Sequence, residues 1–181
     1  MSRYAVFIDA GHFLKALRTF GEPRIDYLKL SEKFRNQDER LRTYYYHCAP
    51  FQSMSPTDEE QKRKSRFDGF ITSLESKPRF QVRLGRLSRG VGQDGAPTFW
   101  QKMVDVLLRV DLVRLSYERQ IQRAVIIAGD SDYVPAIRVA RDAGVIIQLC
   151  YGASPRPHDE LLRACDERII MDQEFIDSVR E

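Results

Sequence analysis

The feature that most constrains the fold is a repeated order of short apolar segment, polar turn and amphipathic segment. Tyr4 to Ile8 is apolar, Asp9 and Gly11 follow it, and residues 13–17 carry apolar side chains at helical spacing. Ala124 to Ala128 is again apolar, and a polar turn and a helical pattern come after it. Strands that alternate with helices predict an α/β fold, with a mostly parallel sheet covered by helices on both faces.

The same patterns predict the other elements. We expect further strands at 41–47, 80–84, 145–151 and 169–170, and further helices at 28–34, 58–74, 100–117 and near 161. Another helix is expected to contain Ile137, Val139 and Ala140 and to be closed by Gly144 in a C-cap position. Residues 80–84 alternate between apolar and polar, which favours a position toward an edge of the sheet. Residues 88–97 contain three glycines, which is typical of a mobile loop.

Length and composition indicate one globular domain, residues 1–181. Hydrophobic residues make up 43% of the chain and charged residues 30%, as in ordinary globular proteins. No apolar run approaches the roughly 20 residues that cross a bilayer, and the first strand starts too early for a signal peptide, so we expect a cytoplasmic protein without a membrane partner. Cys48, Cys150 and Cys165 form no CxxC pair and are expected to be reduced thiols.

Basic residues are clustered although the net charge is only +3. One cluster is Lys62 to Arg66, and arginines recur at 79, 83, 86 and 89. Arginine binds phosphate through a planar set of donors, so both groups are candidates for contact with a nucleic acid. The alternative is that each cluster is simply a solvated face.

Four aspartates are expected to meet at one edge of the sheet. Asp9 ends the first strand, and Asp130 and Asp132 follow the strand 124–128, so parallel strands would bring them to the same edge. Asp105 lies near the start of the helix expected at 100–117 and can face that edge. Each of the other three has an alternative role as a turn or helix-cap residue.

Asp111 is expected to have a different role. It lies six residues after Asp105, which on a helix places it about 120° away, inside the apolar stripe. A buried carboxylate is costly without partners, so structural hydrogen bonds are favoured over metal binding.

Converging carboxylates repel one another and therefore indicate a bound cation. Oxygen ligands without a His or Cys cluster favour Mg²⁺ or Mn²⁺, which commonly binds a few carboxylates together with water and a substrate phosphate. Hydrolysis of a phosphodiester is the natural chemistry for such a site.

Three motifs resemble a known family. The segments 7–11 (FIDAG), 101–105 (QKMVD) and 128–133 (AGDSDY) are similar, in this order, to the NYN domain of LabA-like proteins, within the PIN-like nuclease superfamily. The resemblance covers nearly the whole chain. It implies a Rossmann-like PIN fold and metal-dependent endoribonuclease activity, with Asp9, Asp105 and Asp130 as acidic ligands and Asp132 in support. The chain departs from the pattern where His12 replaces the usual asparagine and Met103 the usual glycine.

The resulting hypothesis is cleavage of RNA at the aspartates with one or two Mg²⁺ or Mn²⁺ ions. The expected substrate-binding residues are His12, Ser131, Lys102, Arg83, Arg86 and Arg89, of which Lys102 is placed three residues before Asp105 on the same helix. His12 could contact a phosphate or merely cap its helix. Tyr45, Tyr46 and Trp100 could stack on bases, although packing in the core is favoured for each.

Other functions remain alternatives. The main rival is an RNA-binding or regulatory adaptor that keeps the acidic pocket but has no turnover. A phosphatase of the haloacid dehalogenase type would need a second aspartate where Gly11 stands, and no GxGxxG follows a strand to bind a dinucleotide. A homodimer is an open alternative.

Overall fold

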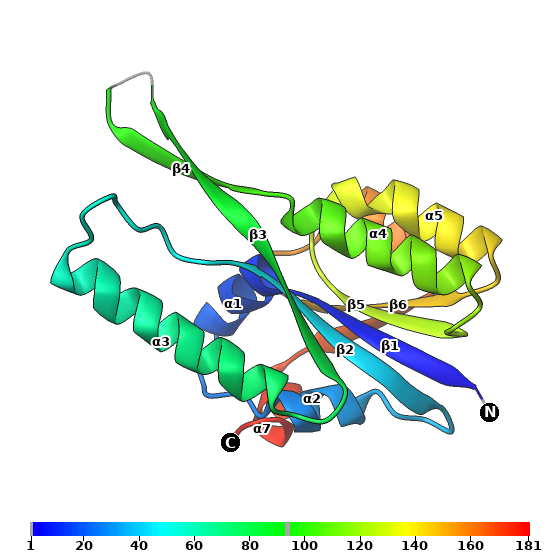
Figure 1. Cartoon of the computed structure of the whole chain (residues 1–181). Helices are drawn as coiled ribbons and strands as arrows, with labels where there is room; N and C mark the ends of the chain where they lie inside the picture. Colours follow the sequence, from blue (N-terminus) through cyan, green and yellow to red (C-terminus); the bar gives the residue numbers. More distant parts are fainter. Residues whose placement is uncertain (1, 93–94) are drawn as a thin grey trace.

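A seven-stranded sheet forms the centre of the computed structural model, which describes residues 2–92 and 95–181, without the side chains of residues 88 and 100–102. The strands are β1 (Arg3–Asp9), β2 (Glu39–Cys48), β3 (Phe80–Val91), β4 (Pro97–Lys102), β5 (Arg123–Ile127), β6 (Ile146–Gly152) and β7 (Glu167–Met171). Their order across the sheet is β4-β3-β2-β1-β5-β6-β7 (Figure 1). Six strands are parallel, and β4 is antiparallel to β3. The expected α/β fold is confirmed.

Helices cover both faces of the sheet. They are α1 (Ala10–Arg18), α2 (Tyr27–Lys33), α3 (Asp58–Glu75), α4 (Val104–Tyr117), α5 (Val134–Asp142), α6 (Asp159–Ala164) and α7 (Gln173–Ser178), with a short 3-10 helix, η1 (Ser131–Tyr133), before α5. One hydrophobic cluster joins the sheet to α4, α5 and α6, and a second joins it to α1, α2, α3 and α7. Figure 1 shows α4 and α5 on one side and α1, α2 and α3 on the other.

Alternation along the strands assigns neighbouring side chains to opposite faces. In β1, Phe7 packs in the first cluster and Ile8 in the second. In β2, Tyr46 faces α4, whereas Tyr45 lies on the face covered by α1 and α3. Both tyrosines are fully buried, which confirms core packing for them.

The glycine-rich segment is largely a β-hairpin, so the prediction of a loop over 88–97 was wrong. Strand β3 continues to Val91 and pairs with β4 from Arg86↔Lys102 to Val91↔Pro97. Pro97 lies at the end of an edge strand, where its missing N–H costs no ladder bond. The prediction failed because the glycines suggested a turn along their whole length, whereas the strand and its antiparallel partner extend through the first of them, Gly90. Figure 1 shows the hairpin projecting from the body of the molecule.

The helix expected from Trp100 begins four residues later. Residues 97–102 form β4, and Met103 adopts a left-handed backbone conformation, with φ 73°, before α4 starts at Val104. Trp100 and Lys102 therefore belong to the hairpin and do not share a helix with Asp105. Periodicity misplaced the boundary because the apolar spacing continues across a sharp backbone turn.

Several smaller features complete the comparison with the sequence. Strand β3 lies toward an edge of the sheet, as expected, with only β4 outside it. Helix α7, which packs Phe175 and Ile176 against the sheet, was not expected. Gly144 ends α5 with φ 87°, as predicted. Cys48, Cys150 and Cys165 are buried. Within residues 2–92 and 95–181, no helix has the length and apolar character that a membrane span requires.

Candidate metal and active site

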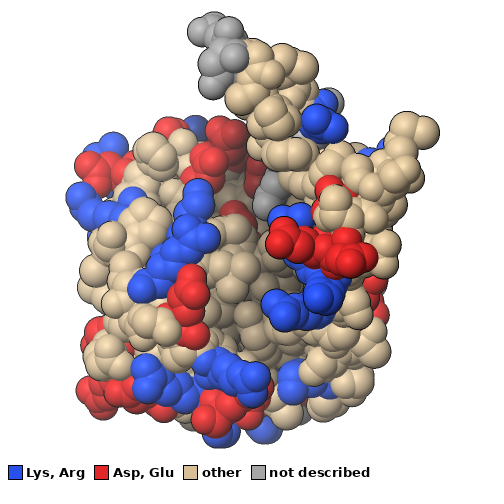
Figure 2. All heavy atoms as spheres, turned by 90° about the vertical axis from the view of Figure 1, so that its left-hand side faces the viewer, with Lys and Arg blue, Asp and Glu red and all other residues tan. Residues whose placement is uncertain are grey.

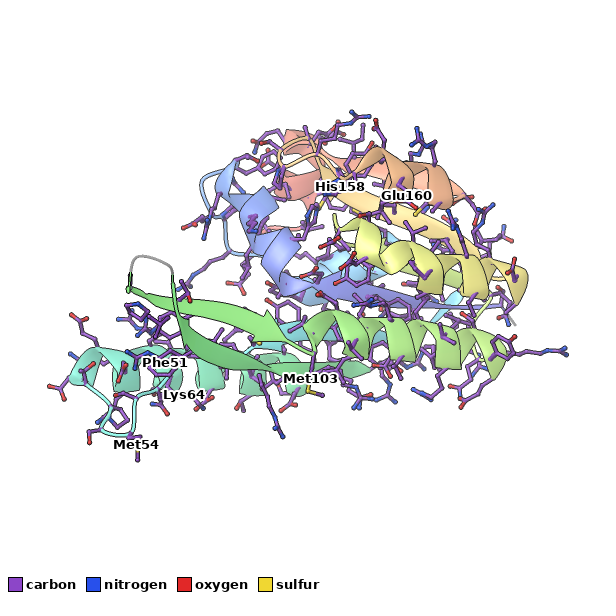
Figure 3. All side chains as sticks on the ribbon, turned by 90° about the horizontal axis from the view of Figure 1, so that it is seen from above. Phe51, Met54, Lys64, Met103, His158 and Glu160 are labelled. Atoms are coloured by element: carbon purple, nitrogen blue, oxygen red, sulfur yellow. The ribbon has the colours of Figure 1, made fainter. Side chains whose placement is uncertain are left out.

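Asp9 and Asp105 approach each other from two different elements. Asp9 is the last residue of β1 and caps α1, because its Oδ1 accepts a hydrogen bond of 3.3 Å from the backbone N–H of His12. Asp105 lies in the first turn of α4, where the positive end of the helix dipole favours a carboxylate. The left-handed turn at Met103 redirects the chain from the hairpin into α4 (Figure 3).

Tyr133 connects the two carboxylates. Its hydroxyl oxygen lies 3.0 Å from Oδ2 of Asp9 and 2.8 Å from Oδ1 of Asp105. Tyr133 is fully buried at the end of η1, and η1 directly follows the turn after β5. The structure thus brings together three residues that are far apart in the sequence, although sequence reasoning had assigned no role to the tyrosine.

Burial dominates the electrostatics of this group. It raises the pKa of Asp9, and the negative charge of Asp105 acts in the same direction, whereas hydrogen bonds from His12 and Tyr133 oppose the rise. Burial and the two neighbouring carboxylates also raise the pKa of Tyr133 far above its usual value. The tyrosine is therefore a neutral hydrogen-bond donor at any physiological pH.

Asp130 borders the same pocket as Asp9 and Asp105. The pocket has a volume of about 270 Å³, and its charged or titratable lining side chains are those of Asp9, Asp105, Asp130, His12, Lys15 and His158. Asp130 is exposed and also caps η1, since its Oδ1 accepts a hydrogen bond of 3.0 Å from the backbone N–H of Asp132. Three of the four predicted aspartates therefore line one pocket.

Asp132 and Ser131 do not line this pocket. The side chain of Asp132 is exposed, and its only described link to the site is the backbone N–H bound to Asp130. Ser131 is partly buried in η1.

His12 lies against the turn after β5. A Cβ atom added to Gly129 would overlap the His12 ring, so the ring packs directly on the glycine backbone. Its Nε2 is buried and has no hydrogen-bond partner among the described residues. Burial lowers the pKa of His12 to about 4, with a smaller contribution from Lys15, so the imidazole is neutral at pH 7.

Asp111 has the structural role expected from its helical position. It is 5% exposed, and its Oδ2 accepts hydrogen bonds from the Tyr46 hydroxyl at 3.0 Å and from Arg83 Nε at 3.2 Å. Arg114 lies 3.5 Å from its other carboxylate oxygen. Arg83, one of the predicted substrate-binding residues, is thus engaged by a carboxylate of the core.

The other predicted substrate-binding cations belong to the hairpin. Arg86 and Arg89 are exposed on β3, and the guanidinium of Arg89 lies 5.6 Å from the ring centre of Phe51. Phe51 in turn contacts the ring of Phe99 on β4, with 4.9 Å between ring centres. The backbone of Lys102 ends β4, but its side chain and that of Trp100 lie outside the described residues. Neither Arg86 nor Arg89 lines the pocket of the aspartates.

Three residues of the site were missed from sequence: Tyr133, Lys15 and His158. Lys15 follows His12 by three residues on α1, so helical spacing alone could have placed both on one side. Tyr133 belongs to the AGDSDY segment, and it reaches Asp9 and Asp105 from the end of η1. The backbone N–H of His158 donates to the carbonyl of Gly129, which joins two loops that no sequence pattern connects.

The donor set suits a hard divalent cation. Two carboxylates lie within hydrogen-bond distance of one hydroxyl, and a third borders the pocket. Within the described part of the chain, no three His, Cys, Asp or Glu side chains are grouped closely enough to hold a metal ion by themselves. Because Mg²⁺ usually completes a small carboxylate set with water and substrate phosphate, this arrangement fits such an ion.

One solved structure shares this fold. The chain is similar to a crystal structure of a protein of unknown function from Vibrio parahaemolyticus, with a TM-score of 0.64, 16% identity, and coverage of 97% of this chain and 96% of that one. A second structure, from Parabacteroides merdae, has a TM-score of 0.29, 17% identity, and coverage of 81% and 24%. No curated protein matches the chain. The model of the NYN domain family matches residues 3–172, which include all four predicted aspartates. The chain therefore belongs to the NYN domain family.

Proposed function

We propose that this chain is a metal-dependent endoribonuclease of the PIN-like nuclease superfamily, of the LabA-like type, acting in the cytoplasm. The proposal rests on one observation. The carboxylates of Asp9 and Asp105 lie within hydrogen-bond distance of the same tyrosine hydroxyl, beside Asp130, at the carboxyl edge of a parallel sheet. Open α/β sheets bind their ligands at this edge.

Asp9 and Asp105 would hold a Mg²⁺ or Mn²⁺ ion, and Asp130 would contribute from the rim of the pocket. When bound, such an ion supplies Lewis-acid chemistry: it neutralises phosphate charge and activates water for attack on phosphorus. Tyr133 keeps the two carboxylates in place with its hydroxyl and contributes no charge. We assign Asp132 a supporting role, because its backbone N–H orients Asp130.

Substrate contacts follow from charge and exposure. Lys15 brings a positive charge to the pocket itself and is the cation best placed to meet a phosphate there. His12 is neutral, so its proposed contact with substrate would be a hydrogen bond rather than an ion pair. Arg86 and Arg89, on the projecting hairpin, would attract the RNA backbone at a distance from the cleavage site.

Cleavage of RNA by matched variants tests this proposal. Wild type should cut labelled single-stranded RNA in the presence of Mg²⁺ or Mn²⁺, and EDTA should stop it. Asp9→Asn and Asp105→Asn should each lower the rate at least about 100-fold, which is the usual scale for loss of a group that stabilises the transition state. Asp132→Asn keeps the backbone N–H and is the control, with a rate close to wild type.

The rival function is an RNA-binding adaptor without turnover. It is favoured by one observation, the lack of a three-residue metal group among the described side chains. Binding of RNA with no product at any Mg²⁺ or Mn²⁺ concentration would replace the nuclease proposal by this alternative. Equal cleavage rates for wild type and Asp9→Asn would reject the assigned site.

A further inference from the structure

The outward face of α4 is apolar. Val106, Val110 and Tyr117 are 50%, 56% and 71% exposed, and Val113 is partly buried. We call these four side chains the α4 stripe. At about 100° per residue, the stripe lies nearly opposite the buried face of the helix, to which Leu108 belongs. Helix α4 is therefore apolar on both sides, but the protein core covers only one of them.

Other helices expose polar faces. Helix α5 exposes Arg138, Arg141 and Asp142, and the exposed side chains of α3 are almost all polar or charged. Figure 2 shows charged side chains of both signs over the face beneath the hairpin. A helix that is apolar all round is normally buried all round. The α4 stripe is an exception on this surface, and this marks it as an interaction surface.

The spacing of the α4 stripe fits another helix. Its members follow one another at intervals of four, three and four residues. This alternation is typical of the seam of a coiled coil, in which the side chains of each helix fill the gaps of the other. A second copy of α4 has the same spacing, and identical subunits usually pair about a two-fold axis, with the same surface used on both. The α4 stripe is thus complementary to itself.

The charges beside the stripe favour an antiparallel pair. Arg109 borders the stripe on one side and Arg114 on the other, and both are partly exposed. In a parallel pair, Arg109 of each copy would face Arg114 of the other, which places like charges together. An antiparallel pair has a register in which Arg109 faces Ser116 of the second copy and Arg114 faces Leu107 of the second copy. This register brings no like charges together across the seam.

The hairpin of β3 and β4 can extend the contact beyond the helix. A helix of 14 residues is about 21 Å long, and a pair of such helices alone falls short of the roughly 800 Å² per partner of a standard interface. The hairpin and α4 extend in opposite directions from Met103 (Figure 3). In an antiparallel pair, each hairpin therefore reaches past the end of the other copy's α4. Val91 and Phe99, which are 78% and 47% exposed, provide apolar side chains on the hairpin.

We propose that a second copy of this chain docks on the α4 stripe, with the two helices antiparallel and Val110 opposite Val113 of the second copy. In this register Val106 lies opposite Tyr117 of the second copy, so all four members of the stripe are covered. Asp105 lies roughly 110° around the helix from the stripe, so the pocket of the aspartates is outside the seam. The inference concerns assembly and does not depend on the proposed function.

Analytical ultracentrifugation of the whole chain over a range of concentrations tests the inference. Wild type should change from monomer to dimer in the micromolar range, as expected of a small interface. Val110→Glu places a charge in the centre of the seam and should raise the dissociation constant at least about 100-fold. Because Val110 is 56% exposed, the dilute variant should melt at the same temperature as dilute wild type. Ile170→Glu, at a 54% exposed position of β7, is the matched control and should dimerise as wild type does.

Disulfide cross-linking tests the direction and the register. Val110→Cys and Val113→Cys are oxidised separately and as an equal mixture, and the native cysteines do not interfere because all three are buried. The antiparallel register predicts more cross-linked dimer in the mixture than in either variant alone, because position 110 faces position 113. A parallel pair would instead cross-link each variant with itself.

Three results would each overturn the inference: wild type that stays monomeric at millimolar concentration, Val110→Glu that dimerises as wild type does, or cross-linking that is no greater in the mixture. If wild type stays monomeric but binds lipid vesicles and Val110→Glu does not, the stripe is a membrane-contact surface and the dimer falls. These outcomes are separate from those of the proposed function, because a monomer that cuts RNA rejects only the dimer and a dimer that cuts none rejects only the nuclease.

Discussion

The hydroxyl oxygen of Tyr133 lies 2.8 Å from Oδ1 of Asp105, and the same oxygen lies 3.0 Å from the carboxylate of Asp9. A phenol has one proton and can donate it to only one of these acceptors at a time. The second contact is favourable only if the other carboxyl carries a proton or if a cation lies nearby. The presence of one proton for two carboxylate acceptors agrees with the raised pKa of Asp9. It is also the physical reason to expect a cation at this site.

Removal of the hydroxyl should therefore destabilise the metal-free protein. Tyr133→Phe leaves Asp9 and Asp105 without their common donor, and we expect a loss of about 1–3 kcal/mol in the free energy of unfolding in EDTA. Urea denaturation with and without Mg²⁺ measures it. Tyr117→Phe, at a tyrosine that is 71% exposed, is the matched control. Equal unfolding midpoints of the two variants in EDTA would show that the hydroxyl has no such role.

The left-handed backbone at Met103 predicts a stabilising substitution. This conformation costs a residue with a Cβ about 1–2 kcal/mol, whereas glycine adopts it without this cost. Met103 is 50% exposed, so little burial is lost on its removal. We expect Met103→Gly to raise the free energy of unfolding by about 0.5–1 kcal/mol, a smaller gain because glycine is more flexible in the unfolded chain.

Met103→Ala is the control for this change. It removes the same side chain but keeps the Cβ, so its unfolding midpoint in urea should not exceed that of wild type. A Met103→Gly variant no more stable than Met103→Ala would contradict the assignment of strain to this position.

Asp111 should matter for stability and not for metal binding. Asp111→Ala removes the acceptor of the buried Tyr46 hydroxyl and the partner of Arg83, which is 33% exposed. We expect a loss of about 2 kcal/mol in the free energy of unfolding, reduced from the value for a fully buried pair because water screens the arginine. Asp142→Ala, at an exposed position of α5, should have little effect. Isothermal titration with Mn²⁺ should give the same affinity for Asp111→Ala and wild type.

Some residues of this site could be predicted from the sequence, because their positions follow from where strands end and helices begin. Asp9 is the last residue of the buried strand β1, Asp130 follows the buried strand β5 within three residues, and the geometry of parallel sheets alone brings them to one edge. Asp105 was assigned correctly to the start of α4 although the helix boundary was wrong, because a carboxylate near a helix start points toward the sheet with either boundary.

Tyr133 and Met103 could not be assigned in this way. The position of Tyr133 depends on one turn of 3-10 helix, and no periodicity predicts so short an element. The turn at Met103 separates two segments whose apolar spacing is continuous, so nothing in the pattern indicated a break. The hairpin was missed because its glycines indicated a loop and because the apolar spacing of α4 continues back into β4.

His47 should make stability fall in mild acid. Burial lowers the pKa of His47 below its usual 6.5, so the unfolded chain binds the proton more tightly than the folded one. The contribution of this histidine to stability is complete above pH 6.5 and is lost as the pH falls from 6.5 toward the folded-state pKa. His47→Gln should reduce the difference between the urea unfolding midpoints measured at pH 7.5 and at pH 5.5.

His12 contributes with the same sign, because its pKa is also lowered, to about 4. Because wild type and His47→Gln both contain His12, its contribution cancels when the pH dependences of the two proteins are compared. His158→Gln controls for the loss of an exposed histidine. An unaltered pH dependence in His47→Gln would contradict the burial of a neutral imidazole at this position.

Gly129 and His12 should be coupled through direct contact. A Cβ at position 129 would overlap the His12 ring, so Gly129→Ala must displace the imidazole, and we expect a loss of about 1–3 kcal/mol in the free energy of unfolding. If the ring is the whole obstacle, its removal should abolish the penalty. The double variant with His12→Ala should then be within about 0.5 kcal/mol of His12→Ala alone, which a double-mutant cycle in urea measures. Gly69→Ala is the control: its added methyl meets no atom within 4 Å on α3, and alanine is the better helix former, so it should stabilise the chain. Additive losses in the cycle would mean that the backbone of the turn, rather than the imidazole, requires the glycine, and His12 would then have no part in shaping the pocket.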